Sequence, residues 1–192
     1  MRNRLLVVLT IAGCFAAGGA AAAPPAFEGG RIDNPSPLPG FTLHDQSGRA
    51  VSLSDQRGKL VLLTFLYTHC KDVCPLTAQN LSGAVQLLGA KRDDVRVLAV
   101  SVDPRGDTPR AVRHFVRVHR LVPQFHYLIG SKTQLEPIWR QYSVTSVNRA
   151  SGDIDHTLYT VLADQTGKAR VLYDATATPV DVAHDLRLLL GH

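Results

Sequence analysis

The feature that most constrains the fold is an apolar run followed at once by two closely spaced cysteines. Residues 60–67 are almost entirely apolar, which is typical of a central strand covered on both faces. The chain then passes through Cys70 and Cys74, and Pro75 follows. Proline is favourable at the start of a helix, because it has no N–H to leave unpaired there. The stretch predicts a buried parallel strand, a cysteine-bearing turn and a helix from Pro75.

Cys74 is expected to lie close to the N-cap of this helix, held extended by the proline after it. A thiolate at that position would be stabilised by the positive end of the helix dipole. The spacing of Cys70 and Cys74 is equally compatible with a structural disulfide or with two inert buried thiols. The spacing alone leaves these alternatives open.

The first 23 residues have the pattern of a secretory signal peptide. Arg2 and Arg4 precede an uncharged stretch that starts at Leu5 and ends in four consecutive alanines before Pro24. This order of basic, apolar and small residues predicts cleavage near Ala23. The mature protein is then expected to be extracytoplasmic, in the periplasm.

Two alternatives for this segment involve attachment to the inner membrane. Residues 11–14, which end in Cys14, resemble the lipoprotein box of bacteria, and residues 5–23 just reach the length that spans a bilayer. With a cleaved signal peptide, Cys14 is lost and Cys70 and Cys74 become the only cysteines. Cleavage therefore accounts for the odd cysteine count.

The remainder reads as one globular domain behind a short linker. The chain has 192 residues, of which 45% are hydrophobic and 19% charged, enough for a single core. Residues 24–40 are expected to form an exposed linker, because they contain five prolines and a Gly-Gly pair. Residues 41–192 are expected to form the domain.

Hydrophobic periodicity and turn signals place helices and strands along this domain. The apolar stripe of the first helix is assigned to Leu76, Leu81, Val85 and Leu88, and Asp107 or Thr108 is expected to cap the helix that starts at Pro109. Beside the strand at 60–67, the expected elements are a hairpin around 45–48, helix 75–88, strand 95–102, a helix from 109, an inserted strand 125–129 and helix 133–142, strands 156–163 and 169–173, and helix 179–190. This order predicts an α/β sheet with right-handed crossovers and an antiparallel end.

Four segments, in their order and spacing, resemble the SCO/SenC family of thioredoxin-fold proteins. They are Tyr-Thr-His-Cys-Lys-Asp-Val-Cys-Pro at 67–75, Val-Ser-Val-Asp-Pro at 100–104, Asp-Thr-Pro at 107–109 and Asp-His at 155–156. The combination is far more specific than two cysteines alone. The resemblance implies an α/β thioredoxin-like fold with an N-terminal β-hairpin and a small inserted strand-helix element before the third core strand.

The same resemblance implies a copper-binding metallochaperone that assists assembly of the CuA centre of cytochrome c oxidase and is not an enzyme. It implies metal ligands at Cys70, Cys74 and His156. Two sulfurs and one imidazole suit Cu(I) and Cu(II), whereas zinc normally takes a fourth ligand. The only methionine is the initiator, which excludes thioether copper sites. The implied partners are the CuA subunit and other periplasmic copper chaperones or thiol oxidoreductases.

The main alternative is a thiol–disulfide oxidoreductase with Cys70 and Cys74 as its redox-active pair, which would keep the cysteines of the oxidase subunit reduced. Oxidoreductases of this fold place a cis-proline before the third core strand. Here no proline occurs between Ile138 and Thr178, and His156 stands in that region. A metal site requires His156, whereas dithiol exchange does not.

Other polar residues are expected to have ordinary roles. His69 adjoins Cys70, but neighbours in an extended segment point to opposite faces, so the two are not expected to share a metal. The formal net charge of +5 falls to +3 without Arg2 and Arg4. Arginines within residues 105–120 are either a solvated helix face or a docking surface for an acidic partner or anionic headgroups. Export and the lack of an aromatic and basic stripe argue against nucleic-acid binding.

Overall fold

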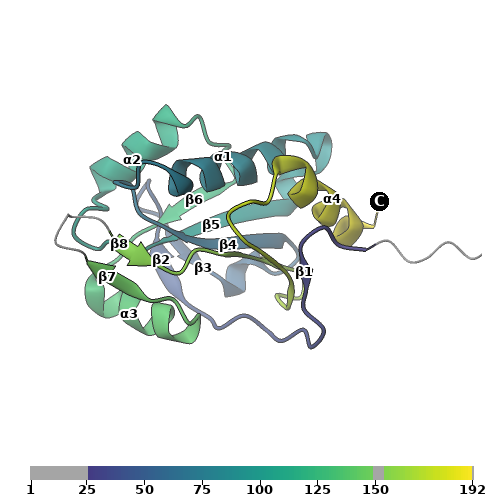
Figure 1. Ribbon diagram of the computed structural model, residues 1–192, viewed down its shortest axis with the longest axis horizontal. Helices are drawn as coiled ribbons and strands as arrows, with labels where there is room; N and C mark the ends of the chain where they lie inside the picture. The colour runs from purple at the N-terminus through teal and green to yellow at the C-terminus, as the bar shows by residue number, and fades with distance from the viewer. Residues whose placement is uncertain (1–25, 149–153, 192) are drawn as a thin grey trace, which may run out of the picture.

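A six-stranded mixed sheet lies at the centre of the protein, with the strand order β1-β10-β9-β4-β5-β6 (Figure 1). The computed structural model describes residues 26–148 and 154–191. The predicted signal peptide or anchor, residues 1–23, lies outside these residues and stays a prediction. Within the described ranges, no helix is both long enough and apolar enough to cross a membrane.

The strands of the sheet combine a parallel and an antiparallel half. They are β1 (Gly30–Arg31), β4 (Leu60–Leu66), β5 (Val95–Ser101), β6 (Phe125–Leu128), β9 (Thr160–Ala163) and β10 (Ala169–Tyr173). Strands β4, β5 and β6 are parallel, whereas β9 is antiparallel to both β4 and β10. Two hairpins lie outside this sheet, namely β2 (Thr42–His44) with β3 (Ala50–Ser52), and β7 (Ser146–Asn148) with β8 (Ile154–His156).

Helices cover both faces of the sheet (Figure 1). Helices α1 (Val73–Gln86), α2 (Pro109–Val118) and α4 (Pro179–Leu190) lie on one face, and α3 (Lys132–Gln141) lies on the other with the β7–β8 hairpin. Short 3-10 helices occupy Ser54–Gln56 and Gly89–Asp94. Right-handed crossovers explain why α1 and α2, which connect successive parallel strands, share a face. This is the thioredoxin-like α/β fold expected from the sequence, and the inserted strand, β6, extends the sheet as its edge.

Strand β4 forms the middle of the core, as its apolar sequence predicts. All seven of its residues are buried, because helices pack on both sides of it. Its one hydroxyl, on Thr64, donates to the carbonyl oxygen of Tyr159 at 3.0 Å and is therefore satisfied inside the core. The carboxyl end of β4 leads directly into the cysteine loop.

Two sequence-based boundaries are wrong. Helix α1 begins at Val73, before Pro75, and Leu76 is 49% exposed although it was assigned to the apolar stripe. Leu76 and the buried Leu81 are five residues apart, which is about 140° around a helix, so they cannot share a narrow face. The strand expected over 156–163 is divided between β8 and β9. Pairing between β9 and β4 ends at Thr160, and the carbonyl of the preceding Tyr159 accepts a hydrogen bond from the Thr64 side chain.

Part of the predicted linker is attached to the domain. Gly30 and Arg31 form β1, which pairs with β10, and the backbone N–H of Leu38 donates to the carbonyl of Gly167 at 3.0 Å. The segment is mostly exposed, as expected, but its backbone hydrogen bonds extend the sheet.

The buried carboxylate of Asp185 on α4 holds the start of this segment. It accepts hydrogen bonds from the backbone N–H groups of Glu28 at 2.8 Å and Gly29 at 3.1 Å, and from the hydroxyl of Tyr173 at 2.8 Å. Glycine is required at position 29, because a Cβ there would lie 2.4 Å from a methyl group of Val171. One carboxylate thus joins the N-terminal segment to β10 and α4.

Asp185→Ala should lower the free energy of unfolding by roughly 1–3 kcal/mol, because it leaves the buried hydroxyl of Tyr173 and two partly buried backbone N–H groups without their acceptor. It should also speed proteolysis ahead of Ile32. Urea unfolding and timed proteolysis measure the two effects. Asp33→Ala is the matched control, since Asp33 forms only an exposed ion pair with Arg31. Equal stability of the two variants would contradict the role given to Asp185.

Candidate metal centre

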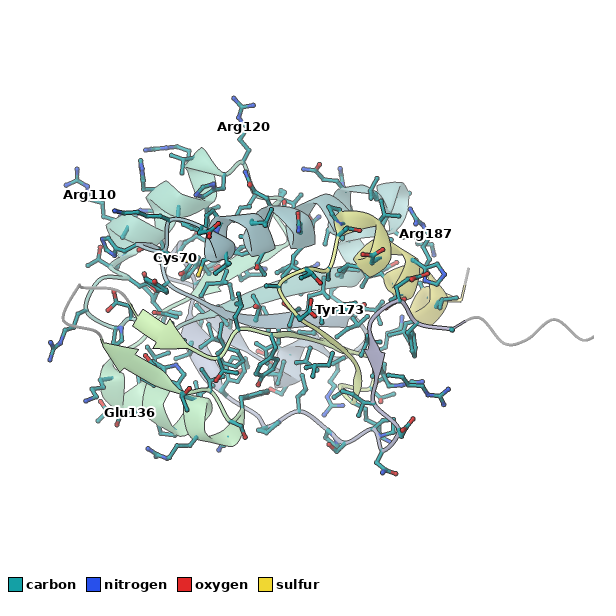
Figure 2. All side chains as sticks on the ribbon, in the orientation of Figure 1. Cys70, Arg110, Arg120, Glu136, Tyr173 and Arg187 are labelled. Atoms are coloured by element: carbon teal, nitrogen blue, oxygen red, sulfur yellow. The ribbon has the colours of Figure 1, made fainter. Side chains whose placement is uncertain are left out.

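The cysteine loop connects β4 to α1 and brings the two predicted cysteines together. Cys70 is half-buried, whereas Cys74, the second residue of α1, is fully buried. The two cysteines do not form a disulfide with each other. The backbone N–H of Cys74 donates to Sγ of Cys70 at 3.4 Å. Figure 2 shows Cys70 at the end of the molecule that also carries the start of α2.

Cys70 is the acidic thiol of the pair. A hydrogen bond from the Cys74 thiol is the largest cause that lowers the pKa of Cys70, to about 5. Backbone N–H groups of Asp72 and Cys74 lower it further, while partial burial opposes them. These N–H groups belong to the start of α1, where unpaired donors and the helix dipole favour an anion. Cys70 is therefore a thiolate at neutral pH.

Cys74 has the opposite character. Its hydrogen bond to Cys70, together with burial, raises the pKa of the Cys74 thiol. The sequence-based expectation that Cys74 would be the activated thiol is therefore wrong. The reason is the position of the helix start. Because α1 begins at Val73, Cys74 points into the core from inside the first turn, and Cys70 lies in front of the free N–H groups.

The carboxylate of Asp107 fixes the loop that precedes Cys70. One oxygen accepts from both the backbone N–H and the hydroxyl of Thr68, at 2.8 and 2.7 Å. The other accepts from the hydroxyl of Ser101 at 2.6 Å and of Tyr127 at 3.2 Å. Asp107 therefore ties the loop after β4 to the ends of β5 and β6. Burial raises the pKa of this carboxyl group, and the hydrogen bonds from Ser101 and Thr68 counteract that rise.

The role of Asp107 was missed in the sequence, where it was considered only as a helix cap. Thr108 is the cap of α2, and its hydroxyl accepts from the N–H of Ala111 at 3.2 Å. Only one of Asp107 and Thr108 can cap α2, so the sequence already indicated that the other residue was available for another contact.

The backbone of His156 lies at the same end of the sheet as the cysteine loop. Its Cα pairs with that of Ser146, whose hydroxyl donates to the carbonyl of Val102 at 3.0 Å. The N–H of Val102 donates in turn to the carbonyl of Leu66, the last residue of β4. The side chain of His156 lies outside the described part of the structure, so its assignment as a ligand stays a prediction.

His69 faces a carboxylate. Its Nδ1 lies 3.9 Å from Oδ2 of Asp103, and ligand atoms of His69, Asp103 and Asp107 lie within 4.8 Å of one another. Both oxygens of Asp107 already accept hydrogen bonds, and Oδ1 of Asp103 accepts from the N–H of Gly106 at 2.9 Å. These contacts brace the loop between β5 and α2.

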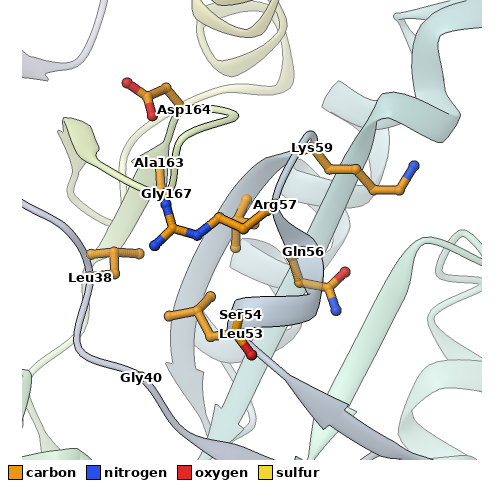
Figure 3. A pocket seen from close by; sticks show the side chains of 11 residues that line it. Leu38, Gly40, Leu53, Ser54, Gln56, Arg57, Lys59, Ala163, Asp164 and Gly167 are labelled. Atoms are coloured by element: carbon orange, nitrogen blue, oxygen red, sulfur yellow. The ribbon is translucent and has the colours of Figure 1, made fainter.

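A cavity of about 170 Å³, partly open to solvent, lies at the amino end of β4, away from the cysteine loop (Figure 3). Arg57 reaches across it towards Gly167, whose φ of 77° favours glycine. No cysteine or histidine lines this cavity. It is separate from the candidate metal centre.

Comparison with known proteins identifies relatives across most of the chain. Residues 32–191 match a family model described as SCO1/SenC. An SCO2-like protein of Rickettsia prowazekii is 30% identical over 134 residues, which cover 67% of this chain and 64% of that protein's length.

Two solved structures share the fold closely. A copper-bound ScoI of Bradyrhizobium japonicum has 30% sequence identity and a TM-score of 0.71, over 80% of this chain and 99% of that one. BsSco, described as a member of the Sco family of cytochrome c oxidase assembly proteins with a disulfide switch, has 25% identity and a TM-score of 0.69, over 82% of this chain and 96% of that one.

Cys74→Ala should raise the pKa of Cys70, because it removes the hydrogen bond that lowers this pKa most. Alkylation of wild-type Cys70 by iodoacetamide should be nearly independent of pH above about pH 6 and should slow as pH falls through 5. In the alanine variant the rate near pH 6 should drop about tenfold for each unit by which the raised pKa of Cys70 exceeds 6. Cys74→Ser, which keeps a hydroxyl donor, should lose less. Identical pH profiles for all three proteins would contradict the assignment.

Asp107→Ala should destabilise the protein by roughly 2–4 kcal/mol, because the donors of Thr68, Ser101 and Tyr127 lose a buried acceptor. Asp107→Asn should retain most of the stability, since its amide oxygen can still accept from Thr68 and its NH₂ can donate to hydroxyl oxygens. Urea unfolding and the alkylation rate of Cys70 test both variants. An asparagine variant as damaged as the alanine variant would show that the charge, and not the hydrogen-bond geometry, is required.

Proposed function

Because the chain belongs to the SCO1/SenC family, we propose that it is an extracytoplasmic copper-binding protein that assists assembly of the CuA centre of cytochrome c oxidase. Copper is its cargo, held by Cys70, Cys74 and His156. The protein carries this cargo and does not convert it chemically. The observation on which the proposal depends is the Cys70 thiolate, half-exposed beside the buried thiol of Cys74.

The donor atoms fit copper. Cys70 already has the deprotonated form that binds metals, and Cys74 lies within hydrogen-bond contact of it. Binding a soft ion through both sulfurs would release the proton of Cys74, which makes copper affinity depend on pH. The backbone of His156 at the same edge of the sheet supports a nitrogen ligand, which Cu(II) requires more strongly than Cu(I) does.

The unequal burial of the two cysteines suits a protein that gives up its metal. Cys70 is accessible, so a ligand of the acceptor can approach the metal from that side, while Cys74 is covered by the core. Transfer would then proceed by stepwise ligand exchange that starts at Cys70. The proposed acceptor is the CuA subunit, and another extracytoplasmic copper chaperone or thiol oxidoreductase would prepare the protein for loading.

The second candidate is a thiol–disulfide oxidoreductase, which the opposite pKa shifts of the two thiols favour. Cys70 thiolate would attack a disulfide of the oxidase subunit, forming a mixed disulfide and releasing one thiolate. Cys74, after losing its proton, would displace the second thiolate. The partner is then reduced by two electrons, and Cys70 and Cys74 become a disulfide.

One set of variants separates the two functions. His156→Ala should keep measurable Cu(I) binding through two thiolates, lose the sulfur-to-Cu(II) charge-transfer absorption and fail to support oxidase assembly in a deletion strain. Its disulfide exchange with a small thiol should change little, because both cysteines remain. Cys70→Ser should lose Cu(I) binding, the charge-transfer absorption, oxidase assembly and disulfide exchange. His44→Ala, on the β2–β3 hairpin, is the control and should behave as wild type.

Copper stoichiometry of the reduced protein, before and after alkylation, completes the test. One copper ion per reduced protein and none after alkylation support the metal centre. If His156→Ala restores oxidase assembly while Cys70→Ser does not, copper ligation is not the function, and the oxidoreductase takes its place.

A further inference from the structure

A positively charged groove lies between the cysteine loop and α2. It has a volume of about 660 Å³, and the described residues that line it include no carboxylate. We call it the arginine groove. Its lining residues are His69, Gly106, Thr108, Arg110, Ala111, Arg113, His114 and Arg117. His69 adjoins Cys70 in the chain, so one end of the groove borders the cysteine loop.

The arginines of this groove have no acidic partner within the part of the chain that the structure describes. None of its ion pairs involves Arg110, Arg113 or Arg117. Nη2 of Arg117 lies 3.2 Å from Nδ1 of His114, so the side-chain contact of Arg117 is with another groove residue. Figure 2 shows Arg110 extended away from the molecule at the end that carries Cys70.

Two of these charges oppose the stability of the helix that carries them. Arg110 lies in the first turn of α2, where the positive end of the helix dipole disfavours a cation. Arg113 follows it at a spacing of three residues, at which like charges repel. Arg117 lies in the last turn of α2, where the dipole favours a cation, as it does for Arg140 in α3 and Arg187 in α4. The placement of Arg110 and Arg113 is therefore locally unfavourable, a pattern that real proteins show mainly at functional sites.

Exposed apolar side chains follow Cys70 in the chain. Val73 is 37% exposed and Leu76 is 49% exposed, and both are in the first turns of α1. Cys70 is therefore flanked in the chain by His69 of the groove on one side and by apolar surface on the other. Protein interfaces commonly combine an apolar centre with a charged surround in this way.

We infer that the arginine groove and the Val73–Leu76 surface together dock a protein whose own metal-binding residues are bordered by carboxylates. The inference rests on the proposed function, since it specifies the surface of the copper acceptor. An acceptor must bring its ligands within bonding distance of a metal at Cys70, and opposite charges beside that point would orient it. A protein surface fits a concave groove next to apolar residues better than the flat plane of a membrane does.

Electrostatic docking of this kind acts mainly on the rate of association. Complementary charges speed encounter at low ionic strength, and salt screens them over roughly 8–10 Å at physiological concentration. The apolar contact at Val73 and Leu76 would persist at high salt. The two parts of the surface can therefore be separated by salt dependence.

The test uses the metal-free protein and, as the probe, the metal-free soluble CuA domain of the oxidase subunit. Arg110→Glu combined with Arg113→Glu should weaken binding about tenfold or more near 20 mM salt and much less near 300 mM. Lys91→Glu with Arg92→Glu, which changes the charge equally on the exposed Gly89–Asp94 helix, should stay within about twofold of wild type. Titration calorimetry gives the affinities.

Loss of folding would not explain weaker binding by Arg110→Glu with Arg113→Glu, which we call the groove variant. Glutamate in the first turn of α2 agrees with the helix dipole, so the groove variant should unfold at a temperature no lower than wild type. Equal affinities of wild type and groove variant would overturn the inference, as would wild type that fails to bind the CuA domain at low salt. Arginine-dependent binding to vesicles of phosphatidylcholine and phosphatidylglycerol, without binding to the CuA domain, would identify a membrane surface instead and overturn it too.

Copper transfer in the same preparations distinguishes the inference from the proposed function. Equal transfer by wild type and groove variant would leave delivery intact and eliminate the docking surface. Arginine-dependent binding without any copper transfer would support the docking surface and reject delivery.

Discussion

The carboxylate of Asp107 is the contact on which the geometry of the cysteine loop depends. It joins Thr68, Ser101 and Tyr127, which belong to the segments of three neighbouring parallel strands. A parallel sheet ends in separate loops, and without such a contact each loop would adopt its own arrangement. Through Asp107, the loop before Cys70 inherits the rigidity of the sheet. The thiolate of Cys70 is thereby held by a rigid frame while it stays accessible.

Two identical side chains acquire different chemistry from their positions at one helix terminus. Cys70 lies in front of the N–H groups of α1 and is acidic, whereas Cys74 lies inside the first turn, is buried and donates to its neighbour. The same asymmetry serves either a metal carrier or a dithiol reductant, because both need one reactive sulfur and one protected sulfur. Both functions need the two cysteines, so a requirement for the proposed third ligand, His156, is what would separate them.

The sequence predicted the parts of this structure that local patterns determine. Continuous apolar residues identified β4, and the helix expected over residues 179–190 is α4. Contacts between distant segments were not predictable in this way. Asp107 resembled an ordinary helix cap. The activated thiol was misassigned because α1 starts two residues earlier than predicted, which places Cys74 in the buried first turn and not before the helix. Periodicity indicates which side of an element is buried but does not identify its polar partners.

The attachment of the N-terminal segment has a mechanical consequence. Tension on the chain ahead of Glu28 would be carried by the hydrogen bonds of Asp185 and by the short β1 strand, at the end of the molecule opposite the β7–β8 hairpin. The load would pass first into β10 and α4, and only through them to the parallel strands that support Cys70. A domain tethered through this segment would be pulled from the end opposite its cysteine loop.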